Sequence, residues 1–165
     1  MFTVSLTALT LLAGADPEPK DANATKIIAR ANWTHARADF NARGKDQVQL
    51  VLRSAAELVD AIPMYKNRDA LPVAVEKSAT ADLAKALKVE DIDWTKQMLV
   101  VVSGGTHRTG GYRVEVTGLA IKDKTMTAKW TLHSPKGIAT AVITHPGEVV
   151  LVPKFAGKVV FDPAK

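Results

Sequence analysis

One continuous apolar run, QMLVVV from Gln97 to Val102, constrains the fold more than any other stretch of this sequence. A run of aliphatic and β-branched residues without alternation is typical of a strand that is buried on both faces. The rest of the chain must therefore supply the elements that cover it.

Two short amphipathic helices are predicted ahead of this strand. SAAELVDAI matches a capping box: Ser54 is the N-cap, Glu57 follows three residues later, and Pro63 ends the helix. TADLAKALK follows the short apolar run VAV, with Thr80 as its N-cap and leucines on one face. Because each helix has an apolar side, each must pack on another element.

Most other segments are predicted to be strands. They are KIIARANWTHAR and QVQLVLR, joined by the turn NARGKD at residues 41–46, and then YRVEV, TMTAKWTLH, ATAVIT, EVVLVP and KVVFD. In TMTAKWTLH the residues Met126, Ala128 and Trp130 share one face. The predicted fold class is α+β: a mainly antiparallel β-sheet, as a meander or a small sandwich, with two short amphipathic helices packed on it.

The composition favours one globular domain, which we place at residues 26–165. The chain has 165 residues, enough for a core without metal or disulfide, and 47% of them are hydrophobic. It contains no Cys, which excludes disulfides, thiolate metal sites and a Cys nucleophile. The net charge of +5 comes from scattered Lys and Arg without interleaved aromatics, so no nucleic-acid partner is expected.

The first residues predict export. Residues 1–15, MFTVSLTALTLLAGA, form a short uncharged apolar run that ends in small residues, as in a signal peptide. The run is too short to span a bilayer, so no stable membrane insertion is expected after cleavage. A polar, Pro-containing linker occupies residues 16–25. The predicted location is the periplasm or the outside of the cell.

The glycine-rich stretch SGGTHRTGGYRVEV, residues 103–116, invites a catalytic or phosphate-binding interpretation. Gly105 and Gly110 have the spacing that opens a phosphate loop, but Gly111 and Tyr112 stand where Lys and Ser/Thr would be needed. The segment that follows reads as a strand, so no helix N-terminus is available to an anion. The phosphate-loop hypothesis is rejected.

Metal and catalytic sites find no support in residue spacing. The four histidines, at positions 35, 107, 133 and 145, are too far apart in sequence for a local metal motif. Asp91 and Asp93 allow a proton-sharing carboxylate pair or a turn before a strand, and the turn is favoured. No catalytic residue, metal ligand or cofactor is therefore assigned.

The glycine-rich stretch is instead interpreted as a hairpin with a polar tip. Four residues are assigned to the hairpin structure: Gly105, Gly110, Gly111 and Tyr112. Four others are the candidate contacts to a partner: Thr106, His107, Arg108 and Thr109. The glycines supply positive φ angles, and the Tyr ring is expected to lie on the core face.

The block DIDWTKQMLVVVSGGTHRTGGYRVEVTGL, followed by turns at residues 134–137 and 144–146, resembles the C-terminal domain of the protease complex subunit PrcB family. The family has a Gly-x-x-x-Thr-Gly-Gly-Tyr loop between two strands. The matching positions are Gly105, Thr109, Gly110, Gly111 and Tyr112. Trp94 stands where the family commonly has Phe, and Arg108 where Pro is frequent. The resemblance extends from about Ser54 to Phe161.

The resemblance implies an exported, non-enzymatic domain that binds a protein partner, such as a protease or an envelope protein, and supports the assembly or stability of a protease complex. The TGGY stretch is also similar to a loop of chagasin-type cysteine protease inhibitors, although two further loop motifs of those inhibitors are missing here. Protease inhibition is therefore the alternative function. Without Cys, the chain has no lipid-attachment residue.

Overall fold

The computed structural model describes residues 23–33, 47–62, 65 and 71–164. The expected signal peptide, most of the expected linker, the turn at residues 41–46 and Pro63 lie outside these residues. The elements, in chain order, are β1 (Ala29–Trp33), β2 (Val48–Leu52), α1 (Ala55–Ala61), α3 (Pro72–Leu87), β3 (Gln97–Ser103), β4 (Arg113–Lys122), β5 (Thr125–His133), β6 (Gly147–Pro153) and β7 (Lys158–Pro163).

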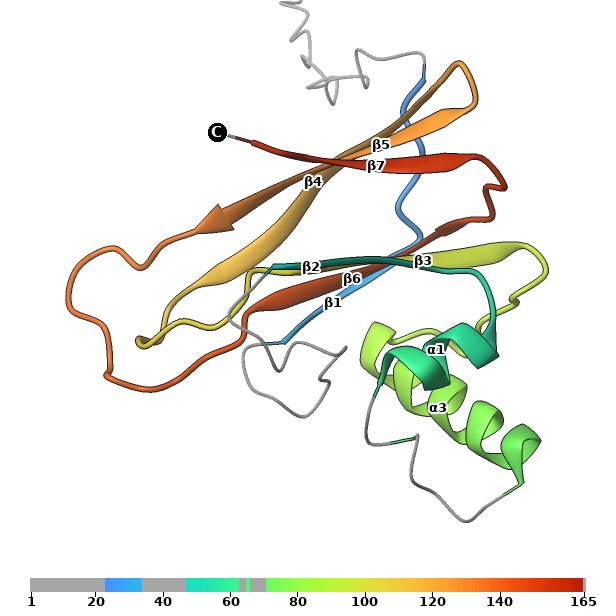
Figure 1. The fold of residues 1–165 in the computed structure, drawn as a ribbon, viewed down its shortest axis with the longest axis horizontal. Helices are drawn as coiled ribbons and strands as arrows, with labels where there is room; N and C mark the ends of the chain where they lie inside the picture. Colours follow the sequence, from blue (N-terminus) through green and yellow to red (C-terminus); the bar gives the residue numbers. More distant parts are fainter. Residues whose placement is uncertain (1–22, 34–46, 63–64, 66–70, 165) are drawn as a thin grey trace, which may run out of the picture.

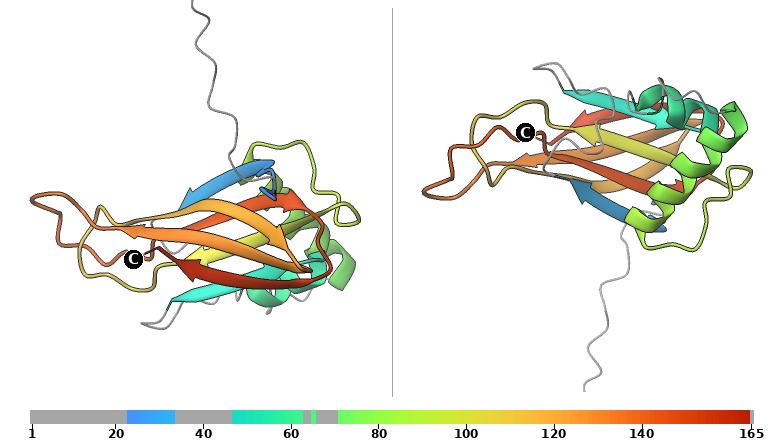
Figure 2. Two further views of the ribbon diagram at one scale, coloured as in Figure 1. Left: turned by 90° about the horizontal axis from the view of Figure 1, so that it is seen from above. Right: turned by 90° about the horizontal axis from the view of Figure 1, so that it is seen from below.

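The elements form three layers, which lie one below the other in Figure 1. One layer is a three-stranded sheet in the order β4-β5-β7, and the next is a four-stranded sheet in the order β1-β6-β3-β2. Helices α1 and α3 cover the outer face of the four-stranded sheet (Figures 1 and 2). The predicted α+β class is confirmed, and both sheets are open.

Strand β3 is buried on both faces, as its continuous apolar sequence predicts. Leu99 and Val101 face the helices, whereas Met98, Val100 and Val102 face the three-stranded sheet. All five side chains are inaccessible to solvent. Its neighbour β6 is buried in the same way. The two central strands therefore need apolar residues at successive positions, because every side chain enters one of two cores.

The core between the sheets is completed by alternating residues of β4 and β5. The predicted inward face of β5, with Met126, Ala128 and Trp130, is confirmed. In β4 the register shifts between Val116 and Gly118, which marks a β-bulge. The extra residue changes which later positions of β4 point inward.

The strand pairing is sandwich-like and differs from a meander. β1 pairs with β6, and β2 pairs with β3. β1 and β2 are therefore not neighbours in the sheet, although they follow one another in the chain. β7 pairs with β5 in parallel, next to an antiparallel β4-β5 hairpin. The strand predicted for ATAVIT is wrong: residues 139–144 contribute one isolated bridge.

The first helix is capped as predicted, since the Ser54 hydroxyl accepts a hydrogen bond from the Glu57 N–H. The second helix is longer than predicted. It begins at Pro72, a residue suited to the first helical position, and Thr80 lies inside it and is buried. The residues VAV belong to this helix because Val75 lies on the buried side with Ala79 and Leu83, at spacings of four residues.

Candidate functional site

The loop of residues 104–112 joins the two sheets and is not a hairpin. β3 already has β2 and β6 on its two edges, so β4 has no edge of β3 to pair with and enters the other sheet. The hairpin predicted for Gly105, Gly110, Gly111 and Tyr112 is therefore wrong. The connection crosses between layers at the end of the molecule away from the helices (Figure 2).

Two glycines in this loop have left-handed backbone conformations. The φ angles of Gly105 and Gly111 are 84° and 85°. A Cβ at Gly111 would also lie 2.8 Å from the Cβ of Pro135, closer than side-chain carbons approach one another. The positive φ predicted for Gly111 is confirmed, but Gly110 does not have one. Gly111 is thus required by both conformation and space.

A second loop, residues 134–146, lies beside the first. Backbone hydrogen bonds join them: Gly104 N–H donates to Pro146 O at 2.8 Å, and Gly110 N–H donates to Thr140 O at 2.9 Å. Between these bonds, His107 and Thr144 each donate to the other's carbonyl at 2.9 Å. We call residues 104–112 and 134–146 the paired loops. They are held by direct hydrogen bonds, each contributing about 1 kcal/mol net.

The His107 side chain belongs to this framework. Its ring stacks on Tyr112 with centroids 3.8 Å apart and an angle of 17° between the planes. Its Nε2 lies 3.1 Å from the carbonyl oxygen of Gly104. Because a carbonyl only accepts, Nε2 is the protonated nitrogen in this hydrogen bond. Tyr112 is half-buried against His107 instead of lying in the core, contrary to expectation.

The other candidate contacts differ in exposure. The Thr106 hydroxyl lies 3.1 Å from Nδ1 of His145, and the Thr109 carbonyl accepts from the Thr144 hydroxyl at 2.9 Å. Arg108 is exposed. The structure thus brings Thr106, His107, Arg108 and Thr109 into one loop end, with Arg108 projecting into solvent. Their contact with a partner stays a prediction.

Three exposed aliphatic side chains in the second loop were missed by the sequence reasoning. The exposed fractions are 107% for Ile138, 64% for Ile143 and 39% for Val142. We call these three residues the aliphatic tip. The available signal is the run IATAVIT between two turns. The strand prediction covers only ATAVIT, and alternation cannot separate a half-buried strand from an apolar loop.

A hollow of about 350 Å³ lies beside the aliphatic tip. Both paired loops line it, through Gly110, Gly111, Pro135, Lys136, Ile138, Ala139 and Thr140. Gly110 and Gly111 contribute backbone without side chains to its lining, and Ile138 and Lys136 contribute an aliphatic and a basic side chain. The hollow is therefore mixed apolar and basic.

The charge of the paired loops has one sign. Neither loop contains Asp or Glu, and the formal cations are Arg108 and Lys136. Two carboxylates follow the loops closely in sequence. Glu148 is buried, and Oε2 of Glu115 lies 2.9 Å from both the Arg113 guanidinium and Nε2 of His133. Arg108 and Lys136 make no ion pair within the described ranges. The paired loops themselves therefore carry a net positive charge.

A buried carboxylate supports the paired loops from inside. Glu148, at the start of β6, is 1% exposed, and its carboxylate accepts a hydrogen bond from the Val116 N–H at the β-bulge. The Arg30 guanidinium lies 3.5 Å away. Burial raises the pKa of Glu148, whereas the Val116 hydrogen bond and the Arg30 charge act in the opposite direction. Glu148 therefore links the two sheets below the loops.

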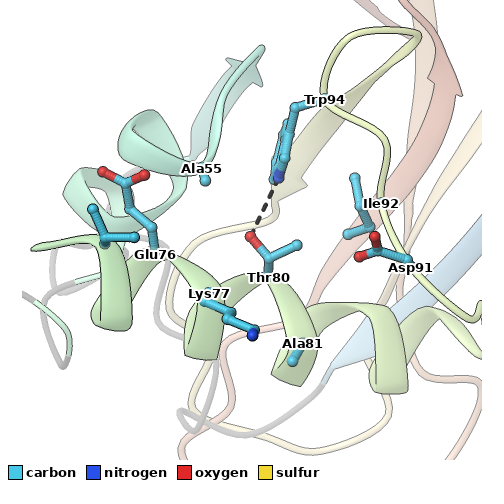
Figure 3. A pocket seen from close by; sticks show the side chains of 9 residues that line it. Ala55, Glu76, Lys77, Thr80, Ala81, Asp91, Ile92 and Trp94 are labelled. Carbon is cyan, nitrogen blue, oxygen red and sulfur yellow. Dashed lines mark hydrogen bonds between the residues drawn. The ribbon is translucent and has the colours of Figure 1, made fainter.

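A second concavity, of about 470 Å³, lies on the helix side between α1, α3 and the segment that leads into β3. Figure 3 shows Trp94 reaching across it, with the indole N–H donating to the Thr80 hydroxyl at 3.2 Å. Glu76, Lys77 and Asp91 also line it. Charges of both signs thus border this groove, in contrast to the paired loops.

Asp93, which was considered together with Asp91, forms a local turn. Its carboxylate accepts from the backbone and hydroxyl of Thr95 and pairs with Lys96 at 3.2 Å. The Thr95 hydrogen bonds, followed by Lys96, lower the pKa of Asp93 to about 2. A carboxylate that ionises this readily is held as an anion, so the turn interpretation is confirmed.

Among the described residues, no group of three or more His, Asp or Glu is arranged to hold a metal ion. Within the same ranges, no helix is long and apolar enough to cross a membrane.

The paired loops and the strands that carry them occupy one continuous stretch, from β3 to β6. Residues 98–153 match the model of the PrcB C-terminal family. The resemblance seen in the sequence is confirmed over this stretch, which is narrower than residues 54–161. The PrcB C-terminal match leaves out both helices and strands β1, β2 and β7. No curated protein and no solved structure gives a significant match to the chain.

Proposed function

We propose that this chain is a non-enzymatic, exported domain that binds a partner protein through its paired loops and supports the assembly or stability of a protease complex. The observation that carries this proposal is the extent of the PrcB C-terminal match. It begins in β3 and ends with β6, so it contains both loops and the strands that hold them.

The geometry of the loops supports a binding role. The two loops are tied together by reciprocal backbone hydrogen bonds between His107 and Thr144, on strands of a packed sandwich. A surface that is ordered before binding loses less conformational entropy when a partner arrives. One of the loops carries three exposed aliphatic residues, Ile138, Val142 and Ile143, and exposed apolar surface can mark a site of protein contact.

The polar side chains of the loops support binding in preference to catalysis. His107 is engaged by Gly104 and Tyr112, and His145 by Thr106. Ser103 is fully buried at the end of β3. These groups maintain the shape of the loops, which is consistent with a domain that presents a surface. Export rests on the signal-like residues 1–15.

Affinity purification from the native host tests the proposal. The tagged wild-type protein is compared with a loop variant, Ile138→Ser with Ile143→Ser, and with a matched control, Leu71→Ser with Val73→Ser. The control residues are 79% and 76% exposed and lie at the start of α3. We expect the same envelope or secreted partner with the wild type and the control, and its loss with the loop variant.

Two outcomes contradict the proposal. Equal recovery of the partner with all three proteins would remove the paired loops from the interaction, and absence of any specific partner would remove the assembly role. Purified protein is also added to a papain-like protease. Tight inhibition that Gly110→Glu abolishes would replace the assembly role with protease inhibition.

A further inference from the structure

The aliphatic tip is an apolar surface that has no structural use within the described chain. Ile138 is fully exposed and Ile143 largely so, whereas the aliphatic residues of β3 and β6 are buried. Val142 lies against Gly110: a Cβ added to Gly110 would be 3.4 Å from Cγ1 of Val142. The tip is thus anchored at Val142 and projects at Ile138 and Ile143.

The positive charges of Arg108 and Lys136, in the paired loops, favour an acidic ligand. Arg108 and Lys136 are both exposed, and neither makes an ion pair with a described residue. The one carboxylate nearby on β4, Glu115, is already paired with Arg113 and His133. A ligand at the paired loops therefore meets a positive charge that no ion pair among the described residues neutralises.

The shape of the hollow favours an extended chain. Gly110 and Gly111 present bare backbone on one side, and a side chain at Gly111 is prevented by Pro135. Ile138 and Lys136 line the hollow with them. A space of about 350 Å³ that is bordered by glycine backbone admits one or two side chains and lets the main chain of an extended segment approach closely.

A protein segment fits this surface better than a lipid bilayer. Membrane-binding tips carry Trp or Tyr at the interface, but Tyr112 is stacked on His107 and half-buried. Binding to anionic lipid also relies on clusters of about four to eight basic residues, and the paired loops contain one Arg and one Lys.

We infer that the paired loops bind an extended acidic segment of the partner, with an aliphatic side chain against Ile138 and carboxylates beside Arg108 and Lys136. The inference rests on the proposed function, because it names the chemistry of the partner that the function requires.

Synthetic peptides test this directly. One peptide alternates Glu and Leu, a second has Lys in place of Glu, and a third has Ser in place of Leu. Binding to the full-length protein is followed through the NMR signals of the Ile138, Val142 and Ile143 methyl groups. We expect the Glu/Leu peptide to bind at least about tenfold more tightly than either control. Its affinity should fall severalfold between about 0.05 M and about 0.5 M salt.

Variants locate the site. The double variant Arg108→Glu with Lys136→Glu is expected to lower the affinity for the Glu/Leu peptide at least about tenfold. Ile138→Ser is expected to lower it severalfold. The matched control is Lys122→Glu with Lys158→Glu, which makes the same charge change on exposed residues of β4 and β7 away from the loops. This control should leave the affinity within about twofold, because exposed charges farther apart than the Debye length are screened.

Three results would overturn the inference: equal binding of the Glu and Lys peptides, an equal loss of affinity in the control variant, or tighter binding to vesicles with anionic lipid than to the Glu/Leu peptide. Its failure is distinct from failure of the proposed function. Suppose that partner binding is lost with Ile138→Ser and Ile143→Ser but is unchanged by Arg108→Glu with Lys136→Glu. The proposed assembly role would then stand, and the inference of an acidic segment would be wrong.

Discussion

Two aliphatic residues at opposite ends of this molecule, Leu58 and Ile138, lie in opposite environments. At the helix end, Leu58 of α1 is 0% exposed and packs in the core under the helices. At the paired-loop end, Ile138 is fully exposed and packs on nothing that the structure describes. The helix end is therefore held by burial of apolar surface, and the paired-loop end by backbone hydrogen bonds between its loops.

Exposed aliphatic side chains occur at both ends, because Leu71 and Val73 at the start of α3 are exposed as well, but those of the paired loops lie within the PrcB C-terminal match. Apolar area that is already buried cannot contribute to association, whereas area left exposed on an ordered loop can. The groove on the helix side is larger, but the Trp94-to-Thr80 hydrogen bond lies within it and charges of both signs border it. The site that we propose is therefore not the larger of these two concavities.

The largest expected effect separates the two ends by stability. Leu58→Ala should lower the free energy of unfolding by about 3 kcal/mol, because it leaves a cavity in a packed core. Ile138→Ala should change it by less than about 0.5 kcal/mol, because the side chain is exposed. Urea unfolding monitored by circular dichroism measures both. Comparable losses at the two positions would mean that Ile138 packs on part of this protein.

A slightly smaller effect is expected at the buried carboxylate below the loops. Glu148→Ala leaves the Val116 N–H without an acceptor and should cost about 2 kcal/mol. Glu148→Gln retains an acceptor oxygen and removes a buried charge, so it should be at least as stable as the wild type at neutral pH. Urea unfolding compares the three proteins.

The pH dependence at Glu148 follows from the direction of its pKa. The folded protein holds this proton at pH values where the unfolded chain has released it, so the contribution of Glu148 to stability falls as the pH rises through the folded pKa. The stability advantage of Glu148→Gln over the wild type should therefore grow from pH 4.5, the ordinary value, upward. An advantage that shrinks with rising pH would contradict the burial argument.

An intermediate effect is expected within the glycine-rich loop. Gly111→Ala forces a side chain into a left-handed backbone and towards Pro135, and should cost about 1–3 kcal/mol. Gly110→Ala is the matched control, because its Cβ would make ordinary contacts and its φ is not left-handed. It should stay within about 0.5 kcal/mol. Thermal unfolding measures the pair, and equal losses would show that crowding of the loop, not the φ angle, is limiting.

The smallest effect contrasts a carboxylate at the helix end with Glu148. The pKa of Asp93 is lowered to about 2 by Thr95 and Lys96, so its contribution is present above the ordinary value of 3.8 and is lost as the pH falls towards 2. Asp93→Asn should therefore be slightly less stable than the wild type at neutral pH, with a difference that disappears towards pH 2. Urea unfolding across this range should show the opposite pH trend from Glu148→Gln.

Much of the fold could be predicted from local pattern. The β3 run, the inward face of β5 and the Ser54 cap are each explained by neighbouring residues, and each is confirmed. The start of α3 was misplaced because β-branched Val73 and Val75 favour a strand locally, whereas packing of Val75 with Ala79 and Leu83 favours the helix.

The site was harder to predict than the fold. The sequence predicted a hairpin with a polar tip at residues 103–116 and placed Arg108 among the candidate partner contacts, but β3 and β4 lie in different sheets. It did not indicate that residues 134–146 lie beside this loop, since those residues are more than twenty positions away and are joined to it by backbone groups that every residue carries.

The amino-acid sequence by itself determined the double burial of β3, the cap of the first helix and the absence of acidic residues from the paired loops, because these depend on residue type at short range. Tertiary structure alone decided that β3 and β4 separate into different sheets, that Ile138, Val142 and Ile143 remain outside, and that Glu148 is buried below them. The physical reason is that each strand has only two edges for pairing and each core has limited space for side chains. Which segments occupy them depends on competition among all the segments of the chain.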